Sequence, residues 1–81
     1  MDAENLLAAL GGRVNITSVE TAITRLRVAV VDSRHVDERA VRECGAIGVV
    51  VQRGAVQVIL GPATEEIAAA LMCLLPGQRQ L

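Results

Sequence analysis

The chain has 81 residues, of which 52% are hydrophobic and 21% are charged, with a net charge of −1 and no Phe, Trp or Tyr. This length suits one small domain, and the hydrophobic fraction is too high for a disordered chain. Without aromatic rings or net positive charge, the chain lacks base-stacking platforms, aromatic cages and a basic surface, so we expect no nucleic-acid partner. The core must be built from Ala, Val, Leu and Ile.

The spacing of the cysteines and the lengths of the apolar runs indicate the cellular compartment in which the protein works. No apolar run approaches the roughly 18 to 20 residues of a membrane span, and no basic start precedes an apolar stretch as in a secretory signal. We therefore expect a cytoplasmic protein. Cys44 and Cys73 are far apart and match no zinc or disulfide spacing. We expect both to be buried, unreactive thiols, and we expect neither a metal nor a cofactor.

The first part of the chain predicts a helix and then two strands. Asp2 is a typical helix N-cap residue, and the apolar residues after it follow helical spacing until Gly11-Gly12. Residues 16–21 are rich in β-branched side chains, and residues 24–31 alternate between apolar and polar side chains. This pattern predicts a half-buried pair of strands.

The second part predicts a helix, a hairpin and a final helix. Asp37 caps a short helix that Gly45 closes. The arms of the hairpin are residues 47–52 and 55–60. Thr64 is the expected N-cap of the last helix, whose apolar positions continue to Leu75.

These elements follow the order α-β-β-α-β-β-α. Strands that arrive in hairpin pairs form antiparallel sheets, and amphipathic helices then cover one face. We therefore predict an α+β fold with a four-stranded antiparallel sheet and three helices on one face. Residues 1–75 are expected to form a single domain, and residues 76–81 a flexible C-terminal tail.

Polar side chains that point one way gather around the connection between the first two strands. Arg25 and Arg27 share a strand face about 7 Å apart, a spacing that suits a tetrahedral anion. Thr24 and Glu20 flank the connection, and Gln57 lies on the same side if the sheet is continuous. Turn amides can add further donors. The alternative is that the two arginines only keep an exposed sheet face soluble.

The same residues resemble the IIB domain of bacterial phosphoenolpyruvate-dependent sugar phosphotransferase systems, of the glucose and N-acetylglucosamine type. The similarity covers most of the chain and is most specific in two motifs, I-T-R-L-R and V-Q-x-I-x-G. The matching segments are Gly11-Gly12, Asn15-Ile16, Ile23-Thr24-Arg25-Leu26-Arg27-Val28, Gly45-Ala46-Ile47-Gly48-Val49-Val50 and Val56-Gln57-Val58-Ile59-Leu60-Gly61.

The resemblance implies a phosphoryl relay. In that relay a cysteine immediately before I-T-R-L-R accepts the phosphoryl group from a phosphohistidine of the IIA protein and passes it to a sugar bound by the membrane protein IIC. By motif position, Arg25 and Arg27 would bind and orient the phosphate and Thr24 would help to position it. Glu20, where the family often has Asp, and Gln57 would line the site. A protein of this kind would work in the cytoplasm, at the inner face of the membrane.

The chain departs from the family at the nucleophile, because the residue before I-T-R-L-R is Ala22. A methyl group has no lone pair with which to attack phosphorus, so the chain as written cannot carry the phosphoryl group. Either the native protein has cysteine at position 22 and was altered, or the chain is a naturally degenerate IIB domain. A degenerate domain would act as a non-catalytic module that binds IIA. A plain structural α/β domain would explain the fold but not the motifs.

Overall fold

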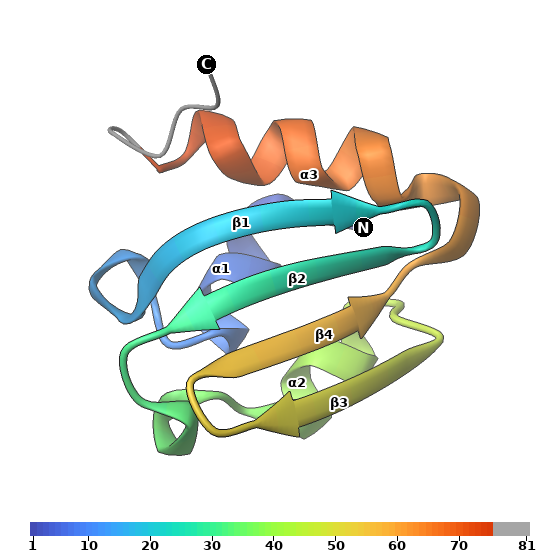
Figure 1. Ribbon diagram of the computed structural model, residues 1–81. Helices are drawn as coiled ribbons and strands as arrows, with labels where there is room; N and C mark the ends of the chain where they lie inside the picture. The colour runs from blue at the N-terminus through green and yellow to red at the C-terminus, as the bar shows by residue number, and fades with distance from the viewer. Residues whose placement is uncertain (76–81) are drawn as a thin grey trace.

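The computed structural model describes residues 1–75 and contains the predicted elements in the predicted order (Figure 1). The helices are α1 (Ala3–Ala9), α2 (Glu38–Glu43) and α3 (Thr64–Cys73), and the strands are β1 (Ile16–Ala22), β2 (Arg25–Val30), β3 (Gly48–Gln52) and β4 (Ala55–Ile59). The tail predicted for residues 76–81 lies outside the described residues.

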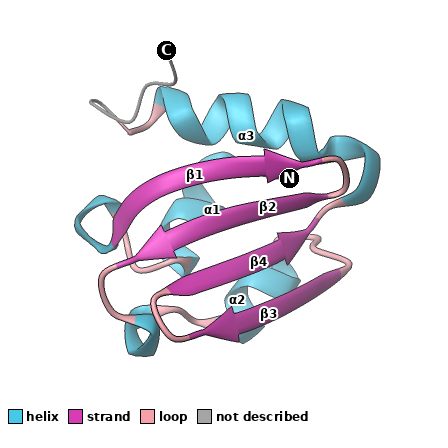
Figure 2. Cartoon of the chain, in the orientation of Figure 1, coloured by secondary structure: helices cyan, strands magenta, loops and turns pink. Residues whose placement is uncertain are grey.

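The four strands form one sheet in the order β1-β2-β4-β3, with every neighbouring pair antiparallel. Leu26 and Val28 of β2 and Val58 of β4 are fully buried on the face that the helices cover (Figure 2). The opposite face carries the polar side chains of the same strands. The predicted α+β architecture is therefore confirmed, and within residues 1–75 no helix covers the second face of the sheet, which we call the open face.

Two predicted helix caps are present and one is wrong. Asp2 accepts a hydrogen bond from the Glu4 amide at 2.9 Å, and Asp37 accepts one from the Ala40 amide at 3.0 Å. Thr64 is not an N-cap but the first residue of α3, and its buried hydroxyl donates to the Gly61 carbonyl at 2.7 Å. The reason is a 3-10 turn, η3 (Gly61–Ala63), that leads directly into the helix.

The cysteine prediction is also wrong. Cys73 is exposed at the end of α3, and Cys44 is half-buried after α2. Partial burial raises the pKa of the Cys44 thiol. The last helix ends at Cys73 and not at Leu75, which is buried beyond it. Cys73 is exposed because it shares the outer face of α3 with Ala69 and Ala70, whereas Ile67, Ala68 and Leu71 face the core. The helix boundary was wrong because apolar helical spacing continues in the sequence past the end of the helix.

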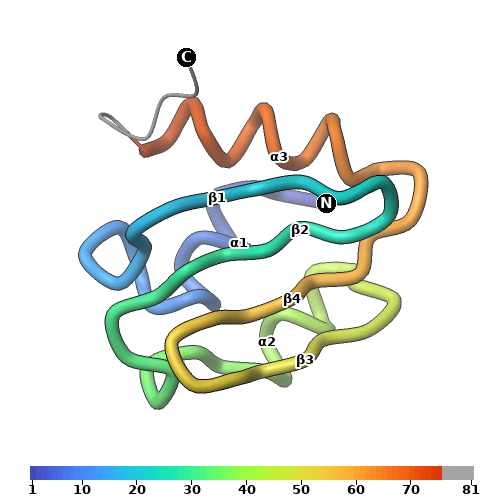
Figure 3. The backbone as a smooth tube through the Cα atoms, in the orientation of Figure 1, coloured from blue at the N-terminus to red at the C-terminus, as the bar shows by residue number. Residues whose placement is uncertain are grey.

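A buried asparagine organises one end of the sheet. Asn15 is only 2% exposed; its side-chain amide donates to the Leu10 carbonyl at 2.8 Å and its oxygen accepts from the Asp32 amide at 2.9 Å. These bonds join the connection after α1 to the connection after β2, where the chain turns at the same end (Figure 3). The β1–β2 turn lies at the other end of the two strands.

Candidate functional site

The candidate site lies on the open face of the sheet, at the end where β1 turns into β2. Glu20 of β1, Arg27 of β2 and Gln57 of β4 form one row across three strands. Ala22 is paired with Arg25 in the neighbouring row, next to the turn. The register therefore brings the predicted polar residues onto one face.

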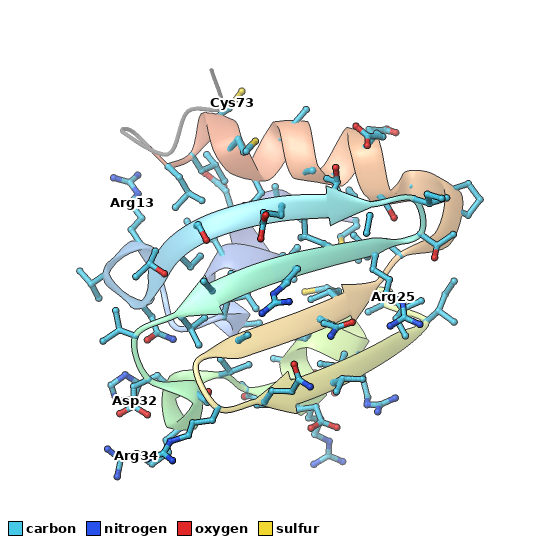
Figure 4. The ribbon with its side chains drawn as sticks, in the orientation of Figure 1. Arg13, Arg25, Asp32, Arg34 and Cys73 are labelled. Carbon is cyan, nitrogen blue, oxygen red and sulfur yellow. The ribbon has the colours of Figure 1, made fainter. Side chains whose placement is uncertain are left out.

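One hydrogen bond fixes part of this face. The Arg25 guanidinium donates from Nη1 to Oε1 of Gln57 at 2.9 Å, diagonally from β2 to β4 (Figure 4). Arg27 is exposed, and within residues 1–75 it makes neither a side-chain hydrogen bond nor a salt bridge, although Glu20 lies opposite it. Arg25 is thus oriented in advance, whereas Arg27 is available to a ligand.

The turn between β1 and β2 consists of two residues, Ile23 and Thr24. Ile23 has a φ of +35°, in the left-handed region that β-branched side chains rarely adopt, and it is 91% exposed. Within the part of the chain that is described, the amides of Ile23 and Thr24 donate no hydrogen bond. Two backbone donors and the guanidinium of Arg25 therefore lie around Ala22, an arrangement that suits an anion.

The turn is held from outside by the end of β4. The amides of Leu60 and Gly61 both donate to the Thr24 carbonyl at 3.0 Å. Gly61 has a φ of +63°, and a Cβ added there would lie 3.2 Å from Cδ1 of Ile47. We call the two hydrogen bonds to Thr24 the Leu60–Gly61 clamp. Gly61 is the glycine of the V-Q-x-I-x-G motif, and the sequence alone does not indicate that its amide binds the β1–β2 turn.

Position 22 itself offers no reactive atom. Ala22 is the last residue of β1 and is exposed. In Figure 4, Cys73 lies at the end of α3 at the top of the view, well away from Arg25 at the right of the sheet. Cys44 follows α2 and packs against the core on the helical side of the sheet. Neither of the two thiols in the chain can replace a nucleophile at the turn.

Comparison with known proteins identifies the scaffold. The family described as "phosphotransferase system, EIIB" matches residues 4–37. The N-acetylglucosamine-specific EIIB component of the phosphotransferase system of Streptomyces coelicolor is 45% identical over 69 residues, which cover 85% of this chain and 90% of that protein. The chain belongs to the EIIB family. It is an EIIB component of a sugar phosphotransferase system. Proteins of this family transfer phosphoryl groups to sugars during sugar uptake.

Two further relatives place this EIIB domain in its family. The MurNAc-GlcNAc-specific EIIBC component of Staphylococcus aureus is 37% identical over 75 residues, which cover 93% of this chain but only 16% of that protein. One domain of a phosphotransferase-system IIabc component from Clostridium difficile has a crystal structure that superposes with a TM-score of 0.73 at 27% identity, covering 100% of this chain and 92% of that one. The EIIB unit thus occurs both alone and joined to other components.

The helices of this EIIB domain are short. Within residues 1–75 none is long and apolar enough to cross a lipid bilayer. These same residues contain no group of three or more His, Cys, Asp or Glu side chains that could hold a metal ion.

Proposed function

We propose that the β1–β2 turn of this EIIB domain is a phosphoryl-binding site whose acceptor position is Ala22. The observation that carries the proposal is the Arg25–Gln57 hydrogen bond at 2.9 Å, which holds a guanidinium next to position 22. A rigid guanidinium fork that already has its orientation loses little entropy when it binds a phosphoryl oxygen.

The role proposed for each residue follows from where it lies relative to position 22. Arg25 and Arg27 bind and orient the phosphoryl oxygens, and Thr24 contributes its amide in the turn. Gln57 holds Arg25, and Glu20 lines the site opposite Arg27. A cysteine at position 22 would supply the thiolate that the relay requires.

The proposed partners are a IIA phosphocarrier protein, which donates the phosphoryl group, and the membrane protein IIC, which binds the sugar. The names of the Streptomyces and Staphylococcus relatives support a sugar of the N-acetylglucosamine class. In this role residues 1–75 act as one domain in the cytoplasm, at the inner face of the membrane. No cofactor is required, because the relay passes the phosphoryl group between side chains.

Exposed apolar side chains beside the turn support docking of another protein there. Ile23 is 91% exposed and Ile47 is 70% exposed, and Ile47 lies next to Gly61 of the clamp. Ile23 gains almost nothing from burial in this fold while its φ of +35° is strained. An apolar residue retained under strain at the surface suits contact with a partner protein.

Restoring the nucleophile tests the phosphoryl site. The Ala22→Cys variant should accept a phosphoryl group from phosphorylated IIA, measured as a mass increase of the intact protein that thiol alkylation before the reaction abolishes. The unmodified chain, which still contains Cys44 and Cys73, is the matched control and should accept none. A folded Ala22→Cys variant that stays unmodified would refute the proposal.

The arginine roles need a second comparison in the Ala22→Cys background. Arg25→Gln and Arg27→Gln should each slow phosphoryl transfer at least about tenfold, the effect of losing one charge-assisted contact. Their stability should change little, because exposed strand charges contribute little to folding. Arg53→Gln, at the opposite end of the sheet, is the control. Equal losses of stability and transfer would mean that the two arginines are structural.

A second candidate function is a non-catalytic module that binds IIA. The observation that favours it is the exposed methyl group of Ala22 among otherwise retained site residues. Titration of the unmodified chain with IIA tests whether the chain binds IIA without a nucleophile at position 22. Absence of binding up to millimolar concentration would exclude the module.

A further inference from the structure

We infer that the chain, as it stands with Ala22, is a selective receptor for the phosphohistidine form of IIA and binds the unphosphorylated form weakly. This inference rests on the proposed function, because it places the phosphoryl group of the partner in the β1–β2 turn. It goes further by assigning the unmodified chain a ligand state and a reason for the alanine.

The first step is the charge around position 22. On the open face, Arg25 and Arg27 contribute two positive charges and Glu20 contributes one negative charge. With a neutral side chain at position 22, the sum is one positive charge. A thiolate at the same position would bring the sum to zero. The alanine therefore leaves a net positive site that an active carrier would lose whenever its thiol ionises.

The second step is the repulsion that alanine removes. A phosphoryl group on histidine is a dianion, and a thiolate within about 5 Å would oppose its approach even in water. Removing a unit charge at that distance from a dianion favours binding about tenfold by Coulomb's law at the dielectric constant of water. An enzyme that binds its substrate too tightly gains nothing in rate, so this extra affinity suits a receptor and not a carrier.

The third step is the set of donors that only a phosphoryl group can use. Arg27 has no side-chain partner, and the amides of Ile23 and Thr24 have no acceptor, within residues 1–75. A neutral imidazole has a single acceptor nitrogen and cannot satisfy all of these donors, and a protonated imidazole would be repelled by the arginines. The phosphoryl oxygens can accept from all of them. The bond between phosphorus and the histidine nitrogen stays intact, because Ala22 has no electron pair to attack it.

The test compares the two states of IIA on the same chain. IIA is phosphorylated by phosphoenolpyruvate and the general components of the phosphotransferase system, and its affinity for the 81-residue chain is measured alongside that of unphosphorylated IIA. Chemical shifts of the Ile23 and Thr24 amides report whether binding occurs at the turn. A net charge of +1 about 5 Å from the phosphoryl dianion is worth about tenfold in affinity at the dielectric constant of water, so we expect phosphorylated IIA to bind about tenfold more tightly than unphosphorylated IIA. Equal affinities would overturn the inference.

Two variants at position 22 separate charge from shape. Ala22→Ser keeps a small neutral side chain and should keep the preference for phosphorylated IIA. Ala22→Asp adds a negative charge and should abolish the preference, while binding of unphosphorylated IIA changes much less. An Ala22→Asp variant that retains the preference would contradict the charge argument.

A third variant separates this inference from the proposed function. If Ala22→Cys accepts the phosphoryl group but the unmodified chain binds both forms of IIA equally, the inference fails and the proposed function stands. If Ala22→Cys accepts nothing and neither form of IIA binds, both fail. Binding of phosphorylated IIA that Arg27→Gln weakens, and that Arg53→Gln at the far end leaves unchanged, supports both.

Discussion

Replacing Gly61 with alanine tests whether the end of β4 controls the geometry of the β1–β2 turn, the proposed phosphoryl-binding site. Gly61 has a φ of +63°, and its amide donates to the Thr24 carbonyl at 3.0 Å. An alanine favours negative φ, so the backbone at this position would rotate and pull its amide away from Thr24. The same substitution at Gly54, where φ is +75°, strains the backbone equally at the opposite end of the sheet. Gly54→Ala is therefore the matched control.

The structure allows the expected losses of stability and of anion affinity to be estimated. A left-handed conformation costs an L-residue about 1 to 2 kcal/mol, so both variants should lose a similar free energy of unfolding. Steric terms differ little: the new Cβ meets only the flexible end of Ile47 at 3.2 Å in one case and the Val30 carbonyl at 4.0 Å in the other. Loss of one clamp hydrogen bond costs about 1 kcal/mol. If the turn must be clamped to bind an anion, this cost lowers the affinity about fivefold.

The assay pairs urea unfolding with a phosphate titration. Inorganic phosphate is added to each variant, and the chemical shifts of the Ile23 and Thr24 amides give the affinity. Gly61→Ala should bind phosphate about fivefold more weakly than the unmodified chain, and Gly54→Ala should bind it normally. Gly61→Asn should recover part of the affinity, because asparagine tolerates positive φ. The reasoning is refuted if Gly61→Ala and Gly54→Ala bind phosphate equally well.

Three further predictions concern stability. Ile23→Asn should raise the free energy of unfolding by about 1 kcal/mol in urea, because asparagine tolerates positive φ; the β-branched control Ile23→Val should give no gain. Asn15→Ala should lower the free energy of unfolding by at least about 2 kcal/mol, because the Leu10 carbonyl and the Asp32 amide lose their partner. An equally stable variant would contradict this role of Asn15. The hydrogen bonds from Arg34 lower the pKa of Asp32 from 3.8 to about 2. The stabilisation from Asp32 is therefore complete above about pH 4 and disappears as the pH falls through about 2, and Asp32→Asn should flatten the stability profile in that range; an unchanged profile would contradict the assignment.

The sequence was sufficient to predict the sheet because alternation alone decides which side of β2 is buried. Leu26 and Val28 are fully buried and Arg25 and Arg27 are exposed, as a period of two requires. Once the two hairpins pair in a continuous sheet, Gln57 comes to lie on the side of the arginines, as predicted. The hydrogen bond between Gln57 and Arg25 then follows from register, which hydrophobic pattern fixes.

The parts that sequence did not predict depend on backbone geometry at element ends. Nothing in the local sequence indicates that Ile23 adopts positive φ, because two-residue turns normally use Gly, Asn or Asp there. The Leu60–Gly61 clamp joins residues more than thirty positions from Thr24, so no local pattern reports it. The N-cap prediction for Thr64 is wrong because a 3-10 turn before a helix has no periodic signal in the sequence.

None of the hydrogen bonds described at the site involves the side chain of position 22. The turn is fixed by backbone hydrogen bonds from Leu60 and Gly61, and Arg25 is fixed by Gln57. Ala22 is exposed at the end of β1, so its side chain adds little to the core. In the proposed site, only the chemical step needs a thiol at position 22, whereas the groups proposed to bind the phosphoryl group belong to the turn and to β2. On the proposed function, a single substitution converts such a domain into a receptor for a phosphorylated partner, because the residues proposed to recognise the phosphoryl group are separate from position 22.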